Sequence, residues 1–197
     1  MLTKVIYIDI DGKSYPMTFS LACLKHMDSI QMIASKVQKN QSISDSAEVI
    51  ARMLSAMITS GCYYCNEMHL TNYKNSPAEN GKIKPLSEEK ILHFIPADEQ
   101  SLKYVVQKIQ LCVNVSNAKS INAVNSVGSK KKEEKALRGD SNLYLYARAI
   151  GLGMKPALVI HMPMGELSEI VDCNLILNGY CDEYLASDDA YVNVDLE

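Results

Sequence analysis

Residues 5–20 read VIYIDIDGKSYPMTFS, and this stretch decides how the fold begins. Its first half is rich in β-branched residues that alternate between two faces, which is typical of a β-strand. Asp11-Gly12 is a dipeptide of the tight hairpin turn, and a return strand follows it. Pro16 has no N–H to donate to a sheet, so we expect the return strand to lie at an edge. The stretch therefore predicts a β-hairpin over Lys4–Ser20.

After the hairpin, apolar residues recur at helical spacing. Ser20 is an N-cap candidate for a helix that runs to about Gln38. Asp45 and Glu48 have the spacing of a capping box, which predicts the start of a second helix. That helix carries the clearest apolar stripe of the chain, formed by Val49, Ile50, Met53, Leu54, Met57 and Ile58.

The next segment alternates loops and helices. Residues 71–85 contain the prolines and glycines of a loop. Ser87 is expected to cap a short helix that ends before Pro96, and Asp98 is expected to begin a longer helix. From about Asn114 the composition turns to Asn, Ser and Lys, which is typical of a linker.

The last third is predicted to form a second helical unit. Leu143–Ile150 is a short apolar helix with Gly151 as its C′ residue, and Glu166–Asn178 is a final amphipathic helix. The fold class is mainly α with little β: an N-terminal hairpin, a helical bundle, a linker and a small C-terminal helical unit. The predicted parts are a β-hairpin plus helical domain over 1–115, a polar linker over 116–142, a small helical domain over 143–186 and an acidic tail over 187–197. We expect a chain that ends near position 127 to fold without the rest.

Composition limits the functional classes. The chain has 197 residues, 22% of them charged, and no apolar run of the roughly 18 residues that a membrane span needs. Its start lacks the apolar core of a signal peptide, so we expect a soluble cytoplasmic protein with reduced cysteines. Residues 141–197 carry 2 Lys or Arg against 9 Asp or Glu, which argues against a nucleic-acid surface there.

Cys62, Cys65 and His69 form the best metal candidate, because zinc binds four such ligands and Cys23 and His26 could in principle supply what is missing. Cys62 and Cys65 lie within a helical pattern, however, and a zinc site usually places one ligand pair on a tight turn. We therefore expect buried thiols and no metal or other cofactor. Gly151-x-Gly153 lacks the third glycine of a dinucleotide-binding loop. The sequence contains no nucleophile or metalloprotease motif, so we expect that the protein is not an enzyme.

The segment Met162–Ile170 is the candidate protein-binding region. Flexible methionines suit adaptable binding surfaces, and they equally suit an irregular core. The hypothesis assigns partner contact to Met162, Met164, Glu166, Leu167 and Ile170. Glu166 and Glu169 share one helix face, where carboxylates are usually solvated.

Several segments resemble the tail assembly chaperones of long-tailed bacteriophages and prophages. Residues 10–20, IDGKSYPMTFS, resemble the hairpin that opens the helical domain of those proteins, and the helix that ends in Ser60-Gly61 continues the layout. Residues 148–154, RAIGLGM, and 162–167, MPMGEL, resemble the C-terminal portion of the same system. Leu158 and the Pro163-Met164 order depart from the usual pattern.

The resemblance implies a function without catalysis. Such chaperones bind the helical segments of the tape measure protein, recruit tail tube subunits, and are absent from the mature virion. Many are made in a short form and in a longer form that results from ribosomal frameshifting, and this chain resembles the long form. The tape measure protein and the tail tube protein are the implied partners, and self-association stays open. Two other functional classes stay open beside the chaperone. One is a small non-enzymatic adaptor or regulator of bacterial or phage origin, and the other is a zinc-binding protein.

Overall fold

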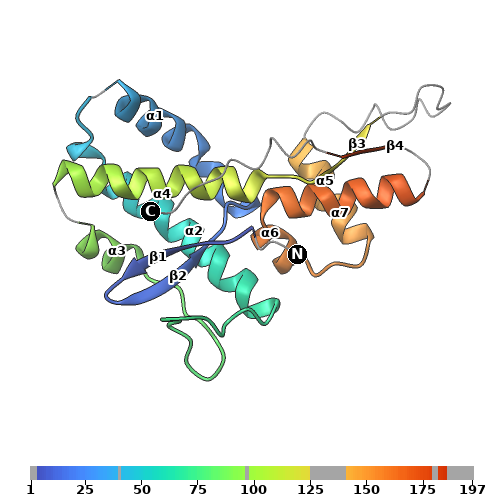
Figure 1. The fold of residues 1–197 in the computed structure, drawn as a ribbon, viewed down its shortest axis with the longest axis horizontal. Helices are drawn as coiled ribbons and strands as arrows, with labels where there is room; N and C mark the ends of the chain where they lie inside the picture. Colours follow the sequence, from blue (N-terminus) through green and yellow to red (C-terminus); the bar gives the residue numbers. More distant parts are fainter. Residues whose placement is uncertain (1–3, 40, 96–97, 125–140, 179–181, 186–197) are drawn as a thin grey trace.

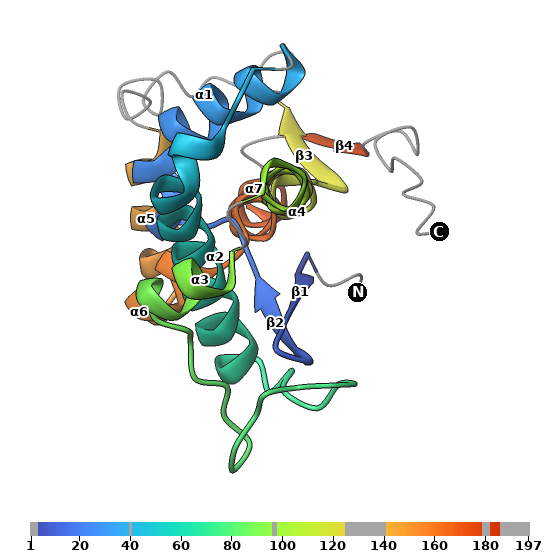
Figure 2. The same ribbon diagram turned by 90° about the vertical axis from the view of Figure 1, so that its left-hand side faces the viewer.

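A computed structural model describes residues 4–39, 41–95, 98–124, 141–178 and 182–185. The chain is mainly helical and has a small antiparallel hairpin at its N-terminal end, as predicted (Figure 1). Two helices, α4 (Glu99–Asn117) and α7 (Met164–Leu177), run along the long axis and appear end-on in Figure 2. No helix in the described ranges is long and apolar enough to cross a membrane.

The hairpin prediction is confirmed. Strands β1 (Ile6–Ile10) and β2 (Lys13–Met17) pair antiparallel around a two-residue turn. Asp11 has φ 50° and Gly12 has φ 72°, so both adopt the left-handed conformation of a type I′ turn. Ile8 and Ile10 are buried, whereas the alternate side chains of β1 are exposed, which is the period-two pattern of a half-buried strand.

Helix α2 (Ala47–Glu67) is the central element, and β2, α3, α4 and α6 all pack against it. Its predicted apolar stripe is buried from Ile50 to Ile58, and Val49 at its start is half-buried. The helix continues through Gly61, where a Cβ atom would lie 2.3 Å from the carbonyl oxygen of Pro16. The backbone N–H of Thr18 also donates to the carbonyl of Met57, at 3.2 Å. Glycine therefore lets β2 lie directly on the helix.

Two predicted caps are wrong. Ser20 precedes a 3-10 helix, η1 (Leu21–His26), which leads into α1 (Met27–Gln38), so the single predicted helix is divided. The Ser20 hydroxyl makes no cap bond, because it is fully buried and donates to Ser60 Oγ at 2.9 Å. The expected capping box at Asp45 is replaced by a 3-10 turn, η2 (Ser44–Ser46), and α2 has no side-chain cap.

Two other caps are confirmed. Ser87 Oγ accepts from the backbone N–H of Lys90 at the start of α3 (Glu88–Phe94), at 3.4 Å. Asp98 Oδ1 accepts from the N–H of Ser101 at the start of α4, at 2.9 Å. Both caps depend on contacts three residues apart, which a sequence displays directly.

The loop before α3 closes the outer edge of β2. The N–H of Ser14 donates to the carbonyl of Asn75 at 2.8 Å, and the Tyr73 hydroxyl donates to the carbonyl of Ser14 at 2.8 Å. Pro16, the other residue that faces this edge, has no N–H to satisfy.

The C-terminal portion contains α5 (Ser141–Gly151), α6 (Pro156–His161) and α7. Pro156 occupies the first turn of α6, where its missing N–H costs nothing. Gly153, with φ 84°, takes the left-handed position expected of Gly151, because α5 continues further than predicted.

A second small sheet was not expected. Strand β3 (Ile121–Val124) follows α4 and pairs antiparallel with β4 (Asp182–Leu185), which follows α7. Most of the predicted linker and the whole acidic tail lie outside the described residues.

One hydrophobic core extends from the hairpin to α7. The C-terminal portion contributes Ala149, Val159, Met162 and Leu167 to the same buried cluster as the hairpin and α2. Figure 2 shows α6 beside α2, and the two helices are in contact. Removing α5–α7 would expose this core to water. The expectation that a chain ending near position 127 folds alone is left to experiment, and the shared core argues against it.

Candidate protein-interaction site

Helix α7 carries three acidic residues at three-residue intervals, Glu166, Glu169 and Asp172. This spacing keeps side chains on neighbouring parts of one helix face. Each of the three carboxylates is bound by a group from the N-terminal portion of the chain. The expectation that Glu166 and Glu169 are solvated is therefore wrong.

Glu166 is bound by a tyrosine from α2. The Tyr64 hydroxyl donates to Glu166 Oε2 at 2.6 Å, and these residues are only 3% and 7% exposed. Burial raises the pKa of Tyr64, and the hydrogen bond to Glu166 and the charge of its carboxylate raise it further. The hydroxyl is thus held as a neutral donor to a buried acid, which satisfies both groups.

Glu169 and Asp172 are held by lysines. Lys4 Nζ lies 2.5 Å from Glu169 Oε2, and Lys119 Nζ lies 2.7 Å from Asp172 Oδ2. The backbone N–H and the hydroxyl of Ser120 also donate to Glu169. Burial by itself would raise the pKa of Glu169, but these donors outweigh it, so the pKa lies below its usual value.

His161 joins α6 to a buried cluster of hydroxyls. Its Nδ1 lies 3.2 Å from Ser60 Oγ, and its ring packs on Tyr63 with the ring centres 4.6 Å apart. Its carbonyl accepts from the Thr18 hydroxyl at 3.4 Å. Burial lowers the pKa of His161, so the neutral ring is favoured. A serine and a histidine thus meet here, and Ser60 is fully buried.

The five predicted protein-binding residues do not form an exposed surface. Met162, Glu166 and Leu167 are buried, and Met164 and Ile170 are half-buried against the core. The N–H of Met164 also donates to the carbonyl of Phe19 at 3.1 Å. In this conformation these residues contact the rest of the chain, so direct partner contact through them stays a prediction and would need α6 and α7 to move.

The candidate metal ligands do not converge. Cys62 and Cys65 are buried within α2, and burial raises the pKa of each thiol to about 12. His69 is exposed and follows the end of the helix, with φ 56°. In the part of the chain that the structure describes, no group of three His, Cys, Asp or Glu residues could hold a metal ion.

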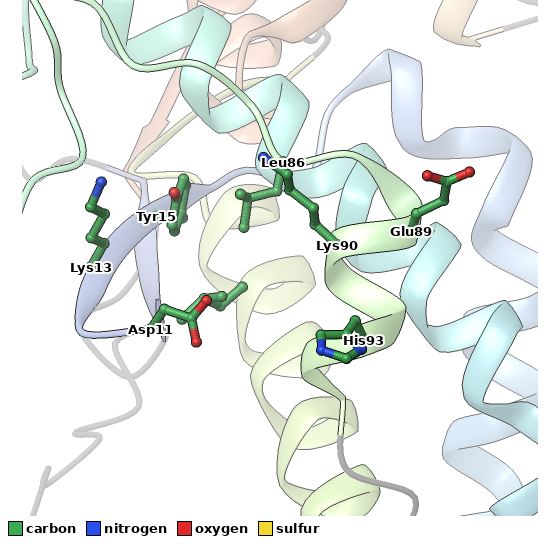
Figure 3. A pocket seen from close by; sticks show the side chains of 8 residues that line it. Asp11, Lys13, Tyr15, Leu86, Glu89, Lys90 and His93 are labelled. Carbon is green, nitrogen blue, oxygen red and sulfur yellow. The ribbon is translucent and has the colours of Figure 1, made fainter.

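A shallow hollow lies between the hairpin turn and α3 (Figure 3). It has a volume of about 480 Å³, and Figure 3 shows its charged side chains spread around the rim, with the Glu89 carboxylate turned away from Asp11. The lining residues are Ile10, Asp11, Lys13, Tyr15, Leu86, Glu89, Lys90 and His93. Charges of both signs surround the hollow without converging on one point, so it resembles ordinary polar surface more than a catalytic centre.

No family model, no curated protein and no solved structure matches the chain. The site is therefore described by its own geometry. It is the contact region in which Lys4, Tyr64 and Lys119 bind the acids of α7 and Ser60 binds His161 of α6, and we call it the seam. Sequence reasoning missed Lys4, Tyr64 and Lys119 as members of this seam. The available signal was the regular spacing of acids on a helix that is otherwise strongly apolar.

Proposed function

We propose that this protein is a non-enzymatic tail assembly chaperone of a long-tailed bacteriophage or prophage. It binds helical segments of the tape measure protein, keeps them soluble in the bacterial cytoplasm, and recruits tail tube subunits before it leaves the assembling tail. The long form of such a chaperone carries both an N-terminal and a C-terminal portion, and this chain has segments that resemble each.

The observation that carries the proposal is the structural role of the residues behind the resemblance. Asp11-Gly12 forms the hairpin turn, the Pro16 carbonyl lies against Gly61, and Met17 and Phe19 are among the most deeply buried side chains. The motif and the helix that ends in Ser60-Gly61 thus form a single packing unit. A motif that specifies a fold in this way supports membership of a family in which the same layout recurs.

The state of the ionisable groups supports a binding role over a catalytic one. The acids of α7 are engaged by Tyr64, Lys4 and Lys119, and the thiols of Cys62 and Cys65 have raised pKa values. Catalytic groups instead need access to a substrate and a pKa suited to proton transfer or nucleophilic attack.

Co-expression with the tape measure protein of the same genome tests the proposal. We expect the tape measure protein, insoluble alone, to become soluble and to elute together with this chain in size-exclusion chromatography. An unrelated helical protein of similar size and charge serves as the control. Addition of purified tail tube protein to the complex should then give a ternary species. A tape measure protein that stays insoluble with a folded excess of this chain would contradict the proposal.

A further inference from the structure

The C-terminal portion covers a defined face of the N-terminal portion. We call the covered face the surface formed by Lys4, Ser60, Tyr64, Lys119 and Ser120 together with the parts of α2 and η1 that α6 packs against. Hydrogen bonds and ion pairs reach across it to α6 and α7 in addition to apolar contacts. Such a mixture is more typical of an interface between proteins than of the centre of a core.

A helix-binding protein needs an apolar surface for the partner helix. In the described residues, the exposed large apolar side chains belong to separate elements and follow no helical or strand-like stripe. They are Tyr7, Met32, Met68, Leu92, Tyr104, Leu143, Leu152 and Leu177. Among the described residues, the extended apolar surface that suits a partner helix is therefore the one that α6 and α7 already occupy.

Helix α7 displays the chemistry that the covered face accepts. Its acids at positions 166, 169 and 172 meet a hydroxyl donor and two ammonium groups. Just before the first acid, Gly165 lies so close to α4 that a Cβ atom would be 2.2 Å from the carbonyl oxygen of Ala118. The face thus selects a helix with a glycine followed by carboxylates at three-residue intervals.

We propose that the covered face is the helix-binding surface of this protein, and that α6–α7 occupy it as an internal substitute which a partner helix displaces. The inference rests on the proposed function and deepens it by naming the surface and the partner's chemistry. The partner is an amphipathic helix with a glycine at its tightest contact and acidic residues at one, four and seven positions after it.

Displacement has a thermodynamic signature. A partner that binds only the open state shows an apparent affinity reduced by the small fraction of molecules that are open. Weakening the contacts between α6–α7 and the covered face raises the fraction of open molecules. The apparent affinity for the partner then increases, although the partner's own contacts are unchanged. Binding elsewhere on the protein would be insensitive to the same change.

The first experiment uses a fluorescent peptide of residues 156–178 with Cys173→Ser as the probe and the full chain as the receptor. The full-chain variant Glu169→Gln/Asp172→Asn removes both ion pairs from the internal copy only. We expect it to bind the probe at least tenfold more tightly than the original chain. Glu88→Gln is the matched control, because it removes an exposed ion pair with Arg52 away from the seam. Equal affinity in all three proteins would overturn the inference.

A charge exchange keeps the test decisive if the double variant unfolds, which circular dichroism would reveal. In the full chain Lys119→Glu, a probe that carries Asp172→Lys should bind more tightly than the unmodified probe, whereas the original chain should prefer the unmodified probe. This reversal identifies the covered face as the place of binding. The same order of affinity in both chains would contradict it.

Segments of the tape measure protein then separate the two proposals. Tighter binding of a tape segment by Glu169→Gln/Asp172→Asn supports both. Binding with the same affinity in the original and variant chains overturns the displacement inference and leaves the chaperone function standing. If no tape segment binds either folded chain, the chaperone function fails, and the peptide experiment still decides whether the covered face binds helices.

Discussion

Gly61 offers the sharpest test of the packing between the hairpin and α2. In an exposed helix interior, Gly→Ala stabilises a protein by up to about 1 kcal/mol, because alanine has the higher helix propensity. At Gly61 the added methyl group would lie 2.3 Å from the oxygen and 2.5 Å from the carbon of the Pro16 carbonyl, and 2.7 Å from the nitrogen of Met17. All three obstructing atoms belong to the backbone, so a side-chain rotation cannot relieve the contact.

The magnitude follows from these distances. Carbon contacts are optimal near 3.5 Å, so β2 would have to move away from α2 by about 1 Å. Inserting a group into a well-packed core costs about 1–3 kcal/mol, and an obstruction by backbone atoms places Gly61→Ala near 3 kcal/mol. Alanine's higher helix propensity offsets up to about 1 kcal/mol of this cost. The free energy of unfolding therefore falls by about 2 kcal/mol, which for a chain of this length lowers Tm by about 4–8 °C.

Thermal and guanidinium unfolding, followed by circular dichroism, measure the effect. Gly151→Ala is the matched control, because it lies in the last turn of α5 and a Cβ atom there would have no neighbour within 4 Å. We expect the control to be neutral or slightly stabilising. A Gly61→Ala protein as stable as the original would refute the close packing of β2 on α2.

Three further predictions follow from the seam and from the buried thiols. Stability should fall on acidification: the pKa of His161 is lowered, so its contribution is lost below about pH 6.5, and the pKa of Glu169 is lowered too, so its contribution is lost below about pH 4.3. Urea unfolding at a series of pH values gives the free energy of unfolding as a function of pH. His161→Gln should reduce its slope just below about pH 6.5, and Glu169→Gln should reduce its slope below about pH 4.3. Unchanged slopes would show that neither group has a different pKa in the folded state. Cys62 and Cys65, with pKa values of about 12, should react with a disulfide reagent at pH 8 at least a hundredfold more slowly in the folded chain than in denaturant, and equal rates would mean that α2 is open. A chain cut after Val127 should lose cooperative unfolding and bind a hydrophobic dye, because its core would be uncovered; a sharp transition with no dye binding would restore the idea of an independent N-terminal domain.

The local sequence was sufficient for the elements whose causes lie within a few residues. The alternation of β1 and the Asp11-Gly12 dipeptide specify the hairpin, because a type I′ turn needs residues that tolerate positive φ. The stripe on α2 follows from its helical period, and the caps at Ser87 and Asp98 follow from contacts three residues apart. These features require no knowledge of what packs against them.

Contacts between distant segments could be found only in the folded chain. Tyr64 and Glu166 are 102 positions apart, and only their approach turns a carboxylate that reads as solvated into a buried hydrogen-bond acceptor. Ser20 reads as a cap and instead binds Ser60, because burial brings the two hydroxyls together and each needs a partner away from water. The same packing determines that residues which read as a partner-binding surface lie inside the fold. Periodicity shows which face of a helix is apolar, but it does not show whether another protein or the chain's own other end covers that face.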